Sequence, residues 1–533
     1  MKTYAIYMLT MALTALITAH SQGKQIFVSP QGTDANSGSM DQPVWSVQKA
    51  QALASPGDTV YIRGGSYPMQ ESDISKVERN IFACISFLDK SGTEQQRINY
   101  WAYPGEQPVF DFSKVKPADQ RVVGFYVTAD YIHLKGIEMT GVQVTITAHT
   151  ESYCVYSYGG NHNIYENLSM HDNKGTGLRH YKGGYNLFLN CDAYNNHDDV
   201  SQDQMGGNTD GFGCHPSEGG KGNVFRGCRA WFNSDDGFDC IRADEAVLFD
   251  SCWAFYNGYS QSFSSLGDGN GFKVGGFAYD EPAKLPDSIP SHTVQFCLAV
   301  RNKANGFYAN HHLSGNSWLN NSAYENNYNY NMVNRESPES QNINVNGYDH
   351  VLKNNLGYNG RSGETRYIDP SQNTLQTNYF ELDFNISDAD FMALDQTQLT
   401  AARDAGGQLP EIDFMQIDPT SEIMDAGTDI GFFFLGEAPE LGAFEQALPK
   451  EILSVENQYG SAGLTYPNPA ANDLYVNNEL NISSATLTGL TGRVHAISWY
   501  NNHIDLSQLG KGVYILNLTT DQGEWFTRKI MKH

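Results

Sequence analysis

The sequence has few positive charges. Its 533 residues carry 34 Lys and Arg against 60 Asp and Glu, which gives a formal net charge of −26 at pH 7. An acidic surface repels phosphate, which excludes a typical nucleic-acid-binding protein, and it also repels anionic polysaccharides. An acidic ligand must therefore be held by a local cluster of cations or by a bound metal ion.

Long hydrophobic runs are also scarce. The one apolar stretch at the N-terminus covers residues 5–19, about 15 residues, which is short for a membrane-spanning helix. It ends in Ala-His-Ser at residues 19–21, the small-x-small form of a signal-peptidase site. We expect residues 1–21 to be a signal peptide and the mature chain, from Gln22, to be secreted or held at the cell surface.

Cysteine is present, but not in the pattern of a disulfide scaffold. Four of the eight cysteines begin the same short pattern, Cys-x-Ala-x-x-Asn, and two looser copies lack the cysteine. The six copies define a column of asparagines: Asn173, Asn196, Asn233, Asn257, Asn302 and Asn326. The shortest steps along this column are 23 and 24 residues, so the chain contains a solenoid repeat with insertions. We expect the cysteines to be small buried residues.

The repeat indicates a parallel β-helix. Each copy follows a large apolar residue by three positions, as expected for an inward column: Tyr165, Phe188, Phe225, Phe249, Val294 and Trp318. An inward asparagine on every turn can hydrogen-bond to the rungs above and below it. The fold class predicted is all-β, with residues 45–54 as a short helix that caps the open N-terminal end.

A second column follows the asparagines and fixes the two faces of one strand per turn. Its inward members are Leu178, Phe212, Phe238, Phe272 and Phe307. Because side chains alternate along a strand, the residues that follow them form an external row with neighbours about 4.8 Å apart. This external row consists of Arg179, Gly213, Asp239, Lys273 and Tyr308.

Superposing the rungs brings four carboxylates together beside a lysine. These are Asp210, Asp235, Asp236 and Asp239, with Lys273 one rung further on. Such acids repel one another unless a cation neutralises them, and a set of oxygen ligands suits Ca²⁺ rather than zinc. Taken singly, each motif has a simpler interpretation, as a solvated Asp-Gly turn or a cross-rung ion pair. Together they predict a calcium site with an adjacent lysine.

These residues resemble the calcium ligands and the catalytic lysine of the family nine polysaccharide lyases, the pectate lyase type with a right-handed parallel β-helix. Residues 26–39 and 43–67 are similar to that family as well, and the likeness extends from Gln25 to Gln446. The resemblance implies a β-elimination in which Ca²⁺ binds the C6 carboxylate of a uronate and Lys273 removes the C5 proton. It also implies activity that requires calcium and rises towards alkaline pH.

The substrate implied is an acidic plant-type polysaccharide, pectate (polygalacturonate) first and rhamnogalacturonan second, cleaved by a monomeric enzyme. Arg179 and Arg242 are candidates to hold further carboxylates, with surface ion pairs as an equal alternative, and Tyr308 is a candidate for contact with a sugar. No partner among nucleic acids is expected.

Two other functions remain open. Residues 208–210 (Asn-Thr-Asp) and the Asp235-Asp236 pair resemble motifs of the polygalacturonases, which are glycoside hydrolases, but the Gly-His-Gly of that family is absent. The alternative outside catalysis is a surface β-helix that binds glycans through Tyr308 and Trp253 and holds calcium for structural reasons. Lys273 favours the lyase, because a structural calcium site does not require a lysine.

The C-terminal part changes character. We expect residues 22–446 to form the β-helix domain, with its last wrapping from residue 369, and residues 447–463 to be a linker. Alternating apolar segments in residues 464–533 predict a small β-sandwich. Its Tyr-Pro-Asn-Pro at 466–469 and Gly-Lys-Gly-Val-Tyr at 510–514 resemble the C-terminal sorting domains of the type IX secretion system of Bacteroidetes. That resemblance implies the type IX secretion machinery as a partner; an accessory carbohydrate-binding sandwich is the alternative.

Overall fold

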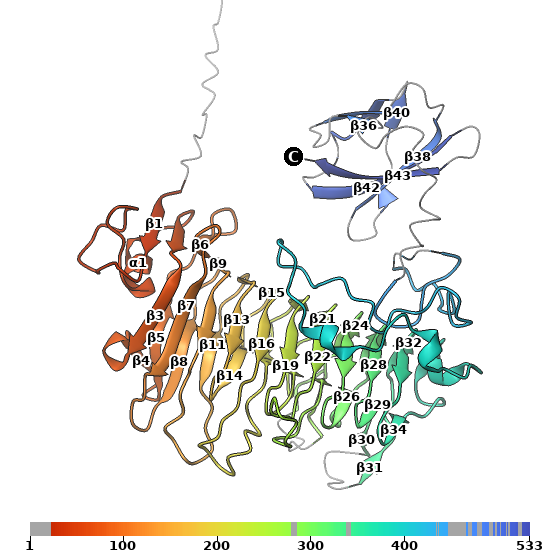
Figure 1. Ribbon diagram of the computed structural model, residues 1–533, viewed down its shortest axis with the longest axis horizontal. Coiled ribbons are helices and arrows are strands. Elements are labelled where there is room, and N and C mark those ends of the chain that lie inside the picture. The colour runs from red at the N-terminus through yellow and green to blue at the C-terminus, as the bar shows by residue number, and fades with distance from the viewer. Residues whose placement is uncertain are drawn as a thin grey trace, which may run out of the picture.

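The computed structural model describes residues 23–278, 285–336 and 343–445 except 433 and 435, together with strands between 465 and 532. The predicted signal peptide and linker lie outside the described residues. Three long sheets run side by side along the molecule, and consecutive segments of the chain visit them in turn (Figure 1). Strand pairing within each is parallel, apart from the β4–β5 pair at one end of the third sheet. The predicted parallel β-helix is therefore confirmed.

The strands of the three sheets are short. The first sheet contains β1 (Gln25–Val28), β2 (Thr59–Ile62), β6 (Ile98–Ala102), β9 (Ile132–Lys135), β12 (Ile164–Glu166), β15 (Leu187–Leu189), β18 (Asn223–Arg226), β21 (Val247–Asp250), β24 (Thr293–Gln295), β27 (Ser317–Leu319), β32 (Val351–Lys353) and β35 (Thr374–Gln376). The second sheet contains β3 (Gly65–Gln70), β7 (Pro108–Lys114), β10 (Glu138–Thr140), β13 (Ser169–His171), β16 (Asp192–Tyr194), β19 (Arg229–Trp231), β22 (Trp253–Phe255), β25 (Leu298–Val300), β28 (Ser322–Tyr324) and β33 (Leu356–Tyr358). The third sheet contains β4 (Lys76–Glu78), β5 (Phe82–Leu88), β8 (Arg121–Val127), β11 (Tyr153–Tyr158), β14 (Thr176–Tyr181), β17 (Phe212–His215), β20 (Phe238–Asp239), β23 (Phe272–Lys273), β26 (Asn305–Tyr308), β29 (Tyr328–Asn331) and β34 (Gly363–Arg366).

The predicted asparagine column is a hydrogen-bonded ladder inside the helix. Its six members are buried at the turn between the second and third sheets. Asn196, for example, donates from Nδ2 to Asn233 Oδ1 at 2.9 Å and to the carbonyl of Met170 at 3.2 Å. The residue before each ladder asparagine has a left-handed backbone: Asp172, Asn195, Phe232, Tyr256, Arg301 and Glu325. The ladder thus pairs polar groups that this sharp turn would otherwise leave buried and unpaired.

The glycine that precedes each inward phenylalanine of the third sheet lies where there is no room for a side chain. A Cβ atom at Gly237 would lie 2.8 Å from Asn257 Nδ2 and 2.8 Å from the carbonyl oxygen of Gly271. Gly211 and Gly271 meet equivalent obstacles on their own rungs. The ladder amide and the next rung therefore fill the room that a side chain would need, which explains why glycine recurs before each inward aromatic residue.

The inward columns form the core. Phe212, Phe238, Phe272 and Phe307 are buried and stack on one another with ring centroids 4.8–5.2 Å apart. All eight cysteines are free and buried, which confirms the prediction made for the four in the repeat. Burying large aromatic side chains removes apolar area from water at about 25 cal/mol per Å², so each rung contributes several kcal/mol before conformational entropy is subtracted.

A short α-helix covers the N-terminal end of the β-helix. The short helix α1 (Val47–Leu53) lies at the N-terminal end, where Ser46 Oγ accepts a hydrogen bond from Lys49 N at 3.0 Å and caps it. This confirms the predicted cap. The turns of 3₁₀-helix are η1 (Glu71–Asp73), η3 (Tyr379–Glu381), η4 (Asp388–Asp390) and η5 (Gln396–Thr400). A short antiparallel pair joins β30 (Asn334–Arg335) to β31 (Asn344–Val345).

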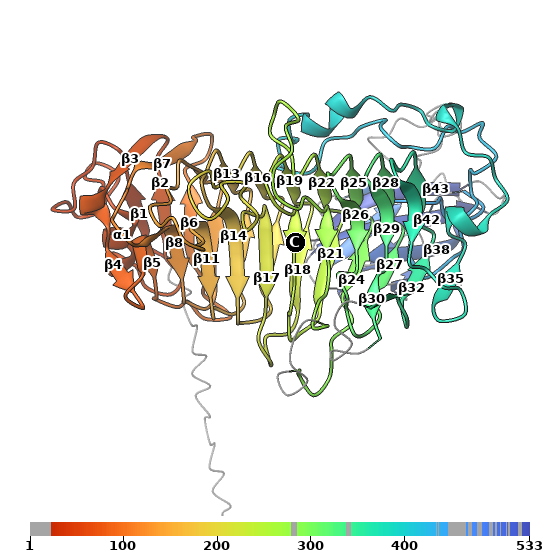
Figure 2. The ribbon, with the colours of Figure 1, turned by 90° about the horizontal axis from the view of Figure 1, so that it is seen from below.

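The segment after β35 does not form a further rung, in contrast to the predicted last wrapping. Residues 377–445 instead run back along the outside of the second sheet (Figures 1 and 2). Arg403 reaches Asp192 at 2.6 Å, and Phe444 lies edge-on to Trp253 with centroids 6.5 Å apart. This cover leaves Trp253 only 2% exposed, so the alternative in which Trp253 contacts a glycan is wrong.

The described C-terminal strands form two antiparallel sheets, as predicted for a sandwich. One contains β36 (Thr465–Tyr466), β37 (Asp473–Val476), β41 (His503–Asp505) and β40 (Ser498–Tyr500). The other contains β39 (Val494–His495), β38 (Ile482–Gly489), β42 (Gly512–Thr520) and β43 (Trp525–Lys532). They share a small core of their own that includes Leu474, Leu487 and Leu516. Within the described residues, no helix is long and apolar enough to span a bilayer.

Candidate active site

The predicted external row exists on the third sheet. Arg179 pairs in register with Gly213, which pairs with Asp239, and Asp239 pairs with Lys273. Lys273 in turn pairs with Tyr308. The side chains of consecutive rungs are therefore neighbours on one outward face, although they are separated by up to 35 residues of sequence.

Three of the four predicted metal ligands converge. Asp210, Asp236 and Asp239 each place a carboxylate oxygen within 4.8 Å of the others, and all three are buried. We call this group the carboxylate triad. Asp235 is also buried but is not part of this group, and its Oδ1 accepts a hydrogen bond from Asp268 N at 3.1 Å.

Backbone donors orient the triad. Asp236 Oδ1 accepts from Asn270 N at 2.7 Å and from Asn270 Nδ2 at 2.8 Å. Asp210 Oδ1 accepts from Asp236 N at 3.2 Å, and Asp239 Oδ1 accepts from Ile241 N at 2.6 Å. Each carboxylate is therefore fixed through one oxygen, and its second oxygen is available for another partner. Asn270 stands directly before the glycine of its rung, as Asp210 and Asp236 do on theirs, but its hydrogen bonds to Asp236 were not predicted.

Lys273 lies against the triad. Its Nζ is 3.2 Å from Asp239 Oδ2, to which it donates a hydrogen bond. Nζ is also 3.0 Å from Asp236 Oδ2, without the geometry of a hydrogen bond, so this buried oxygen has no donor among the described residues. Burial lowers the pKa of Lys273, but the surrounding carboxylates outweigh burial and raise that pKa well above its usual value.

The acids themselves repel one another. Burial, followed by the charges of Asp239 and Asp236, raises the pKa of Asp210 well above its usual value. Burial and the charges of Asp236 and Asp210 have the same effect on the pKa of Asp235. A divalent cation relieves this repulsion. A site made of carboxylate oxygens fits Ca²⁺, and Asp236 Oδ2, which has no hydrogen-bond donor among the described residues, is free to bind it. The residues that could hold the ion are the carboxylate triad, with Asp235 at its edge.

A gap in the external row separates the triad from Arg179. A Cβ atom at Gly213 would lie 3.0 Å from His215 Nε2 and 3.5 Å from Arg179 Cγ, so these two side chains leave little room for another side chain here. His215 Nδ1 lies 2.8 Å from the carbonyl oxygen of Ile241, while its Nε2 is buried without a partner among the described residues. Burial and Arg179 lower the pKa of His215 to about 3, which keeps its imidazole neutral. The repeat pattern did not single out this histidine as part of the site.

Arg179 is held by a carboxylate that the sequence analysis did not identify. Its Nη1 lies 2.6 Å from Glu151 Oε2, and both side chains are partly buried. Burial opposes the charge of Arg179, but Tyr153 and Glu151 raise its pKa. The guanidinium is thus a fixed positive charge one rung before the gap. Glu151 lies 28 residues upstream, outside the repeat pattern, so spacing could not have placed it.

Tyr308 and Arg242, the two remaining residues predicted to bind substrate, lie at the edges of the candidate site. Tyr308 is half-buried on the rung after Lys273, with its ring edge-on to His311 at 6.4 Å. Arg242 is exposed just after β20 and has a left-handed backbone with φ of 54°. Their positions bring Tyr308 next to Lys273 in the external row, whereas Arg242 lies beyond the end of the Asp239 strand.

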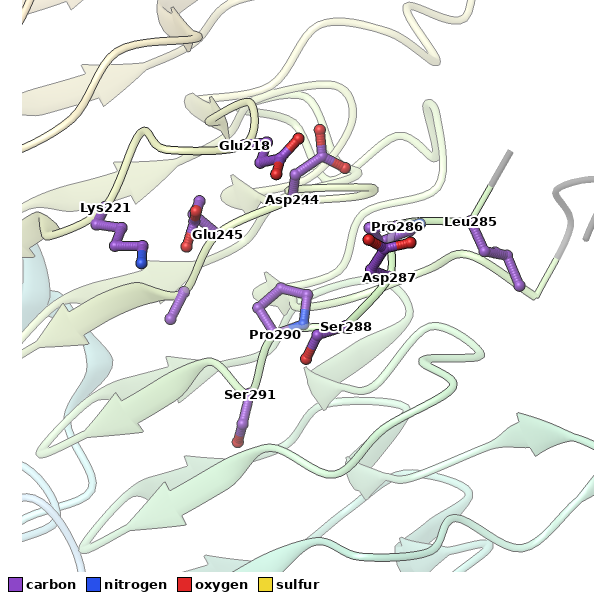
Figure 3. A pocket seen from close by; sticks show the side chains of 11 residues that line it. Glu218, Lys221, Asp244, Glu245, Leu285, Pro286, Asp287, Ser288, Pro290 and Ser291 are labelled. Atoms are coloured by element: carbon purple, nitrogen blue, oxygen red, sulfur yellow. The ribbon is translucent and has the colours of Figure 1, made fainter. Parts of the chain in front are cut away.

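A separate cavity lies away from the external row, and its charge does not suit an acidic polymer. It measures about 700 Å³ and is lined by Glu218, Asp244, Glu245 and Asp287, with Lys221 as its cation (Figure 3). None of the predicted site residues lines it. Its carboxylates would repel a polyuronate, so the external row is the better candidate for the active site.

Comparisons with known proteins identify the family of the chain. Residues 26–377 match the family model described as Pel9A-like, right-handed β-helix region, and residues 464–533 match the secretion system C-terminal sorting domain. The chain is 34% identical to pectate lyase L of Dickeya chrysanthemi over 81% of its own length and 92% of that protein.

Two solved structures are similar as well. A rhamnogalacturonan lyase aligns with 41% identity and a TM-score of 0.72, covering 74% of this chain and 97% of that one. Pectate lyase Pel9A aligns with 32% identity and a TM-score of 0.65, covering 80% and 97%. The prediction of a polysaccharide lyase is thereby confirmed over the hydrolase and the non-catalytic alternatives. The sorting domain implies secretion or attachment to the cell surface. The chain belongs to the Pel9A-like family of right-handed β-helix polysaccharide lyases.

Proposed function

We propose that this lyase cleaves galacturonate-containing polymers by calcium-dependent β-elimination, with Lys273 as the base. The observation that carries the proposal is the contact of Lys273 with a buried triad of carboxylates, one of whose oxygens has no donor. The reaction removes the proton at C5 of a uronate and expels the oxygen at C4, which leaves an unsaturated sugar.

Asp210, Asp236 and Asp239 would hold the calcium ion, with Asp235 as a fourth ligand. Bound there, Ca²⁺ would neutralise the C6 carboxylate of the substrate and stabilise the negative charge that develops as C5 loses its proton. The protein residues position that ion at the base: the same Asp236 and Asp239 that bind Lys273 belong to the triad.

Lys273 must be neutral for part of the time to accept a proton. Carboxylates raise its pKa and burial lowers it. When a cation takes up the carboxylate charge, the raising effect weakens and burial remains, so the pKa of Lys273 falls. Because the neutral fraction still increases with pH, we expect activity to rise towards alkaline pH.

Arg179 and the rung of Gly213 would receive a second part of the substrate. Gly213 lies between the fixed charge of Arg179 and the triad, and it adds no side chain to the external row there. We assign Arg179 and Arg242 to substrate carboxylates and Tyr308 to a sugar next to Lys273. Bidentate hydrogen bonds from arginine suit carboxylates.

Pectate is the first candidate substrate, since the curated relatives are named pectate lyases. Rhamnogalacturonan is the second, and the rhamnogalacturonan lyase structure with its 41% identity favours it. Both polymers present a galacturonate at the bond to be cleaved. We further propose that residues 1–21 are removed as a signal peptide, that residues 22–446 act as a monomeric catalytic domain, and that residues 447–463 link it to the sorting domain at 464–533.

The test measures ultraviolet absorbance of unsaturated uronides. The mature chain is incubated with polygalacturonate or rhamnogalacturonan, with calcium or with a chelator, beside Lys273→Ala. Absorbance that requires both calcium and Lys273 supports the proposal, and the responding polymer identifies the substrate. Equal absorbance from Lys273→Ala would remove the lysine from its assigned role, and equal absorbance in chelator would remove the calcium.

A further inference from the structure

A second cleft lies on the third sheet, on the N-terminal side of the carboxylate triad. It has a volume of about 570 Å³, and its lining includes Arg79, Arg121, Glu151, Tyr158, Arg179 and Lys182. We call it the distal cleft. Arg179 belongs both to this cleft and to the external row, so the distal cleft continues the candidate active site along the same face.

The floor of the distal cleft is aromatic. On the outer face of the third sheet, an apolar cluster separate from the core includes Phe82, Tyr126, Tyr153 and Tyr156. Tyr158 is half-buried above this cluster, with its ring centroid 5.5 Å from that of Tyr156. Aromatic rings of this kind offer a flat apolar surface with polar hydroxyls at the edge, which suits the face of a sugar ring.

Two cations converge on Tyr158. Arg79 Nη1 donates to the Tyr158 hydroxyl at 3.3 Å, and its guanidinium lies 5.3 Å from the ring centroid. Lys182 Nζ donates to the same hydroxyl at 3.1 Å and lies 4.9 Å from the centroid. One phenol oxygen therefore holds two positive side chains side by side.

A third cation, Arg121, donates from Nε to Thr150 Oγ1 at 3.2 Å. Among the described residues, no carboxylate forms an ion pair with Arg79, Arg121 or Lys182, although the chain as a whole carries a net charge of −26. Glu151 is the one carboxylate in the lining, and it already pairs with Arg179 and accepts the hydroxyl of Tyr153.

We propose that the distal cleft is a second carboxylate-binding subsite, in which Arg79 and Lys182 hold a uronate remote from the bond that is cleaved while the tyrosines contact its ring. We propose a uronate because the cleft carries positive charge and because it continues the external row. Tyr158 on β11 is four strands away from Lys273 on β23, or roughly 19 Å at about 4.8 Å per strand. The bound uronate is therefore several sugars away from the base.

This inference rests on the proposed function for the identity of the polymer, but its test does not require turnover. Binding of polygalacturonate and of rhamnogalacturonan is measured by affinity electrophoresis and calorimetry with calcium, using the full mature chain in a Lys273→Ala background. Lys182→Gln and Arg79→Gln are introduced there separately. The matched control is Lys353→Gln, which removes the same charge from a half-buried lysine on the first sheet.

We expect Lys182→Gln and Arg79→Gln each to raise the dissociation constant of the preferred polymer about tenfold, as for the loss of one charge-assisted hydrogen bond. Lys353→Gln should leave it unchanged, and Lys182→Arg should restore most of the affinity. In the Lys273 parent, the same variants should raise KM for polymer and leave kcat for short oligomers unchanged.

Unchanged affinity in both cleft variants, or an equal loss in the Lys353→Gln control, would overturn the subsite. An equal loss of affinity for an uncharged polysaccharide would also overturn the subsite, because the proposal is that the cleft recognises carboxylates. If the cleft variants lose affinity but the parent releases no unsaturated product, the subsite stands and the proposed reaction fails, so the two failures are distinguishable.

Discussion

Asp210→Asn should have opposite effects on stability with and without calcium. The substitution keeps an oxygen that can accept the hydrogen bond from Asp236 N, at 3.2 Å in the parent, and removes one negative charge. Two unit charges 4.8 Å apart, the limit of spacing in the triad, repel by about 3 kcal/mol at an effective dielectric of 20. Asp210 faces two such partners, so the metal-free parent gains little from its charge.

The raised pKa of Asp210 determines how the stability of the metal-free protein changes with pH. A carboxyl whose pKa is higher in the folded chain than the unfolded value near 3.9 favours the folded state at low pH. That contribution is lost as pH rises through the window between the two pKa values. The metal-free parent should therefore lose stability above about pH 4, and the asparagine variant should lose less, because Asp235 is left with a raised pKa. At pH 7 in chelator, we expect the variant to be at least as stable as the parent.

In calcium, the parent should instead be more stable than Asp210→Asn. A ligand that binds only the folded state at 100 times its dissociation constant adds about 2.7 kcal/mol. The variant lacks one of the anionic ligands and should gain less, so its melting temperature in calcium should fall below that of the parent. Differential scanning calorimetry of both proteins in chelator and in calcium measures the crossing directly.

Asp192→Asn is the matched control. Asp192 is a partly buried carboxylate of the β-helix, but Arg229 and Arg403 pair with it, and its pKa is lowered. Removing one partner of a buried pair costs about 3–5 kcal/mol, and this loss should be the same in both media. If Asp210→Asn behaves like Asp192→Asn, with an equal loss in chelator and in calcium, the triad is a structural element and the metal assignment is wrong.

Three further outcomes are expected. Asn257→Ala removes one member of the ladder and should cost about 1–3 kcal/mol in chemical unfolding while the calcium response stays unchanged, whereas a changed response would connect the ladder to the metal site. Burial lowers the pKa of His180 to about 4 and of His350 to about 3, so stability should be full above about pH 6.5 and fall as the pH drops towards 4; a melting temperature that is constant from pH 7 to 5 would contradict this. Lys273→Arg keeps the ion pairs but replaces the base with a group that stays protonated, so elimination measured by absorbance should drop 10²- to 10⁴-fold without loss of polymer binding, and near-normal rates would exclude Lys273 as the base.

The repeat made much of the site predictable. Because the register of a β-helix is set by its inward columns, the spacing of Phe212, Phe238 and Phe272 was enough to place Asp239 beside Lys273. The triad followed from the same superposition, although the sequence could not separate Asp235 from the three acids that converge.

Other features were beyond the reach of the pattern. The distal cleft lies on β8, β11 and β14, at the edge of the region where the asparagine column begins, so no repeat fixed which tyrosines face outward there. Trp253 does lie on the outer face of its strand, but Phe444 covers it. Contacts between a rung and a segment about 190 residues further on leave no periodic trace in the sequence.

The arrangement of columns separates stability from specificity. On the third sheet, each rung contributes an inward residue to the continuous core and an outward residue to the external row, about 4.8 Å from its neighbours. A change at Phe238 would therefore create a cavity and weaken the fold, whereas a change at the outward Tyr308 would alter the external row with less effect on the core. In a chain this acidic, an anionic polymer gains attraction only where cations are grouped, at the metal site, Arg179 and the distal cleft. Because these lie in line across successive rungs, the length of polymer needed for tight binding should be set by the number of rungs between Lys273 and Tyr158 rather than by the metal site alone.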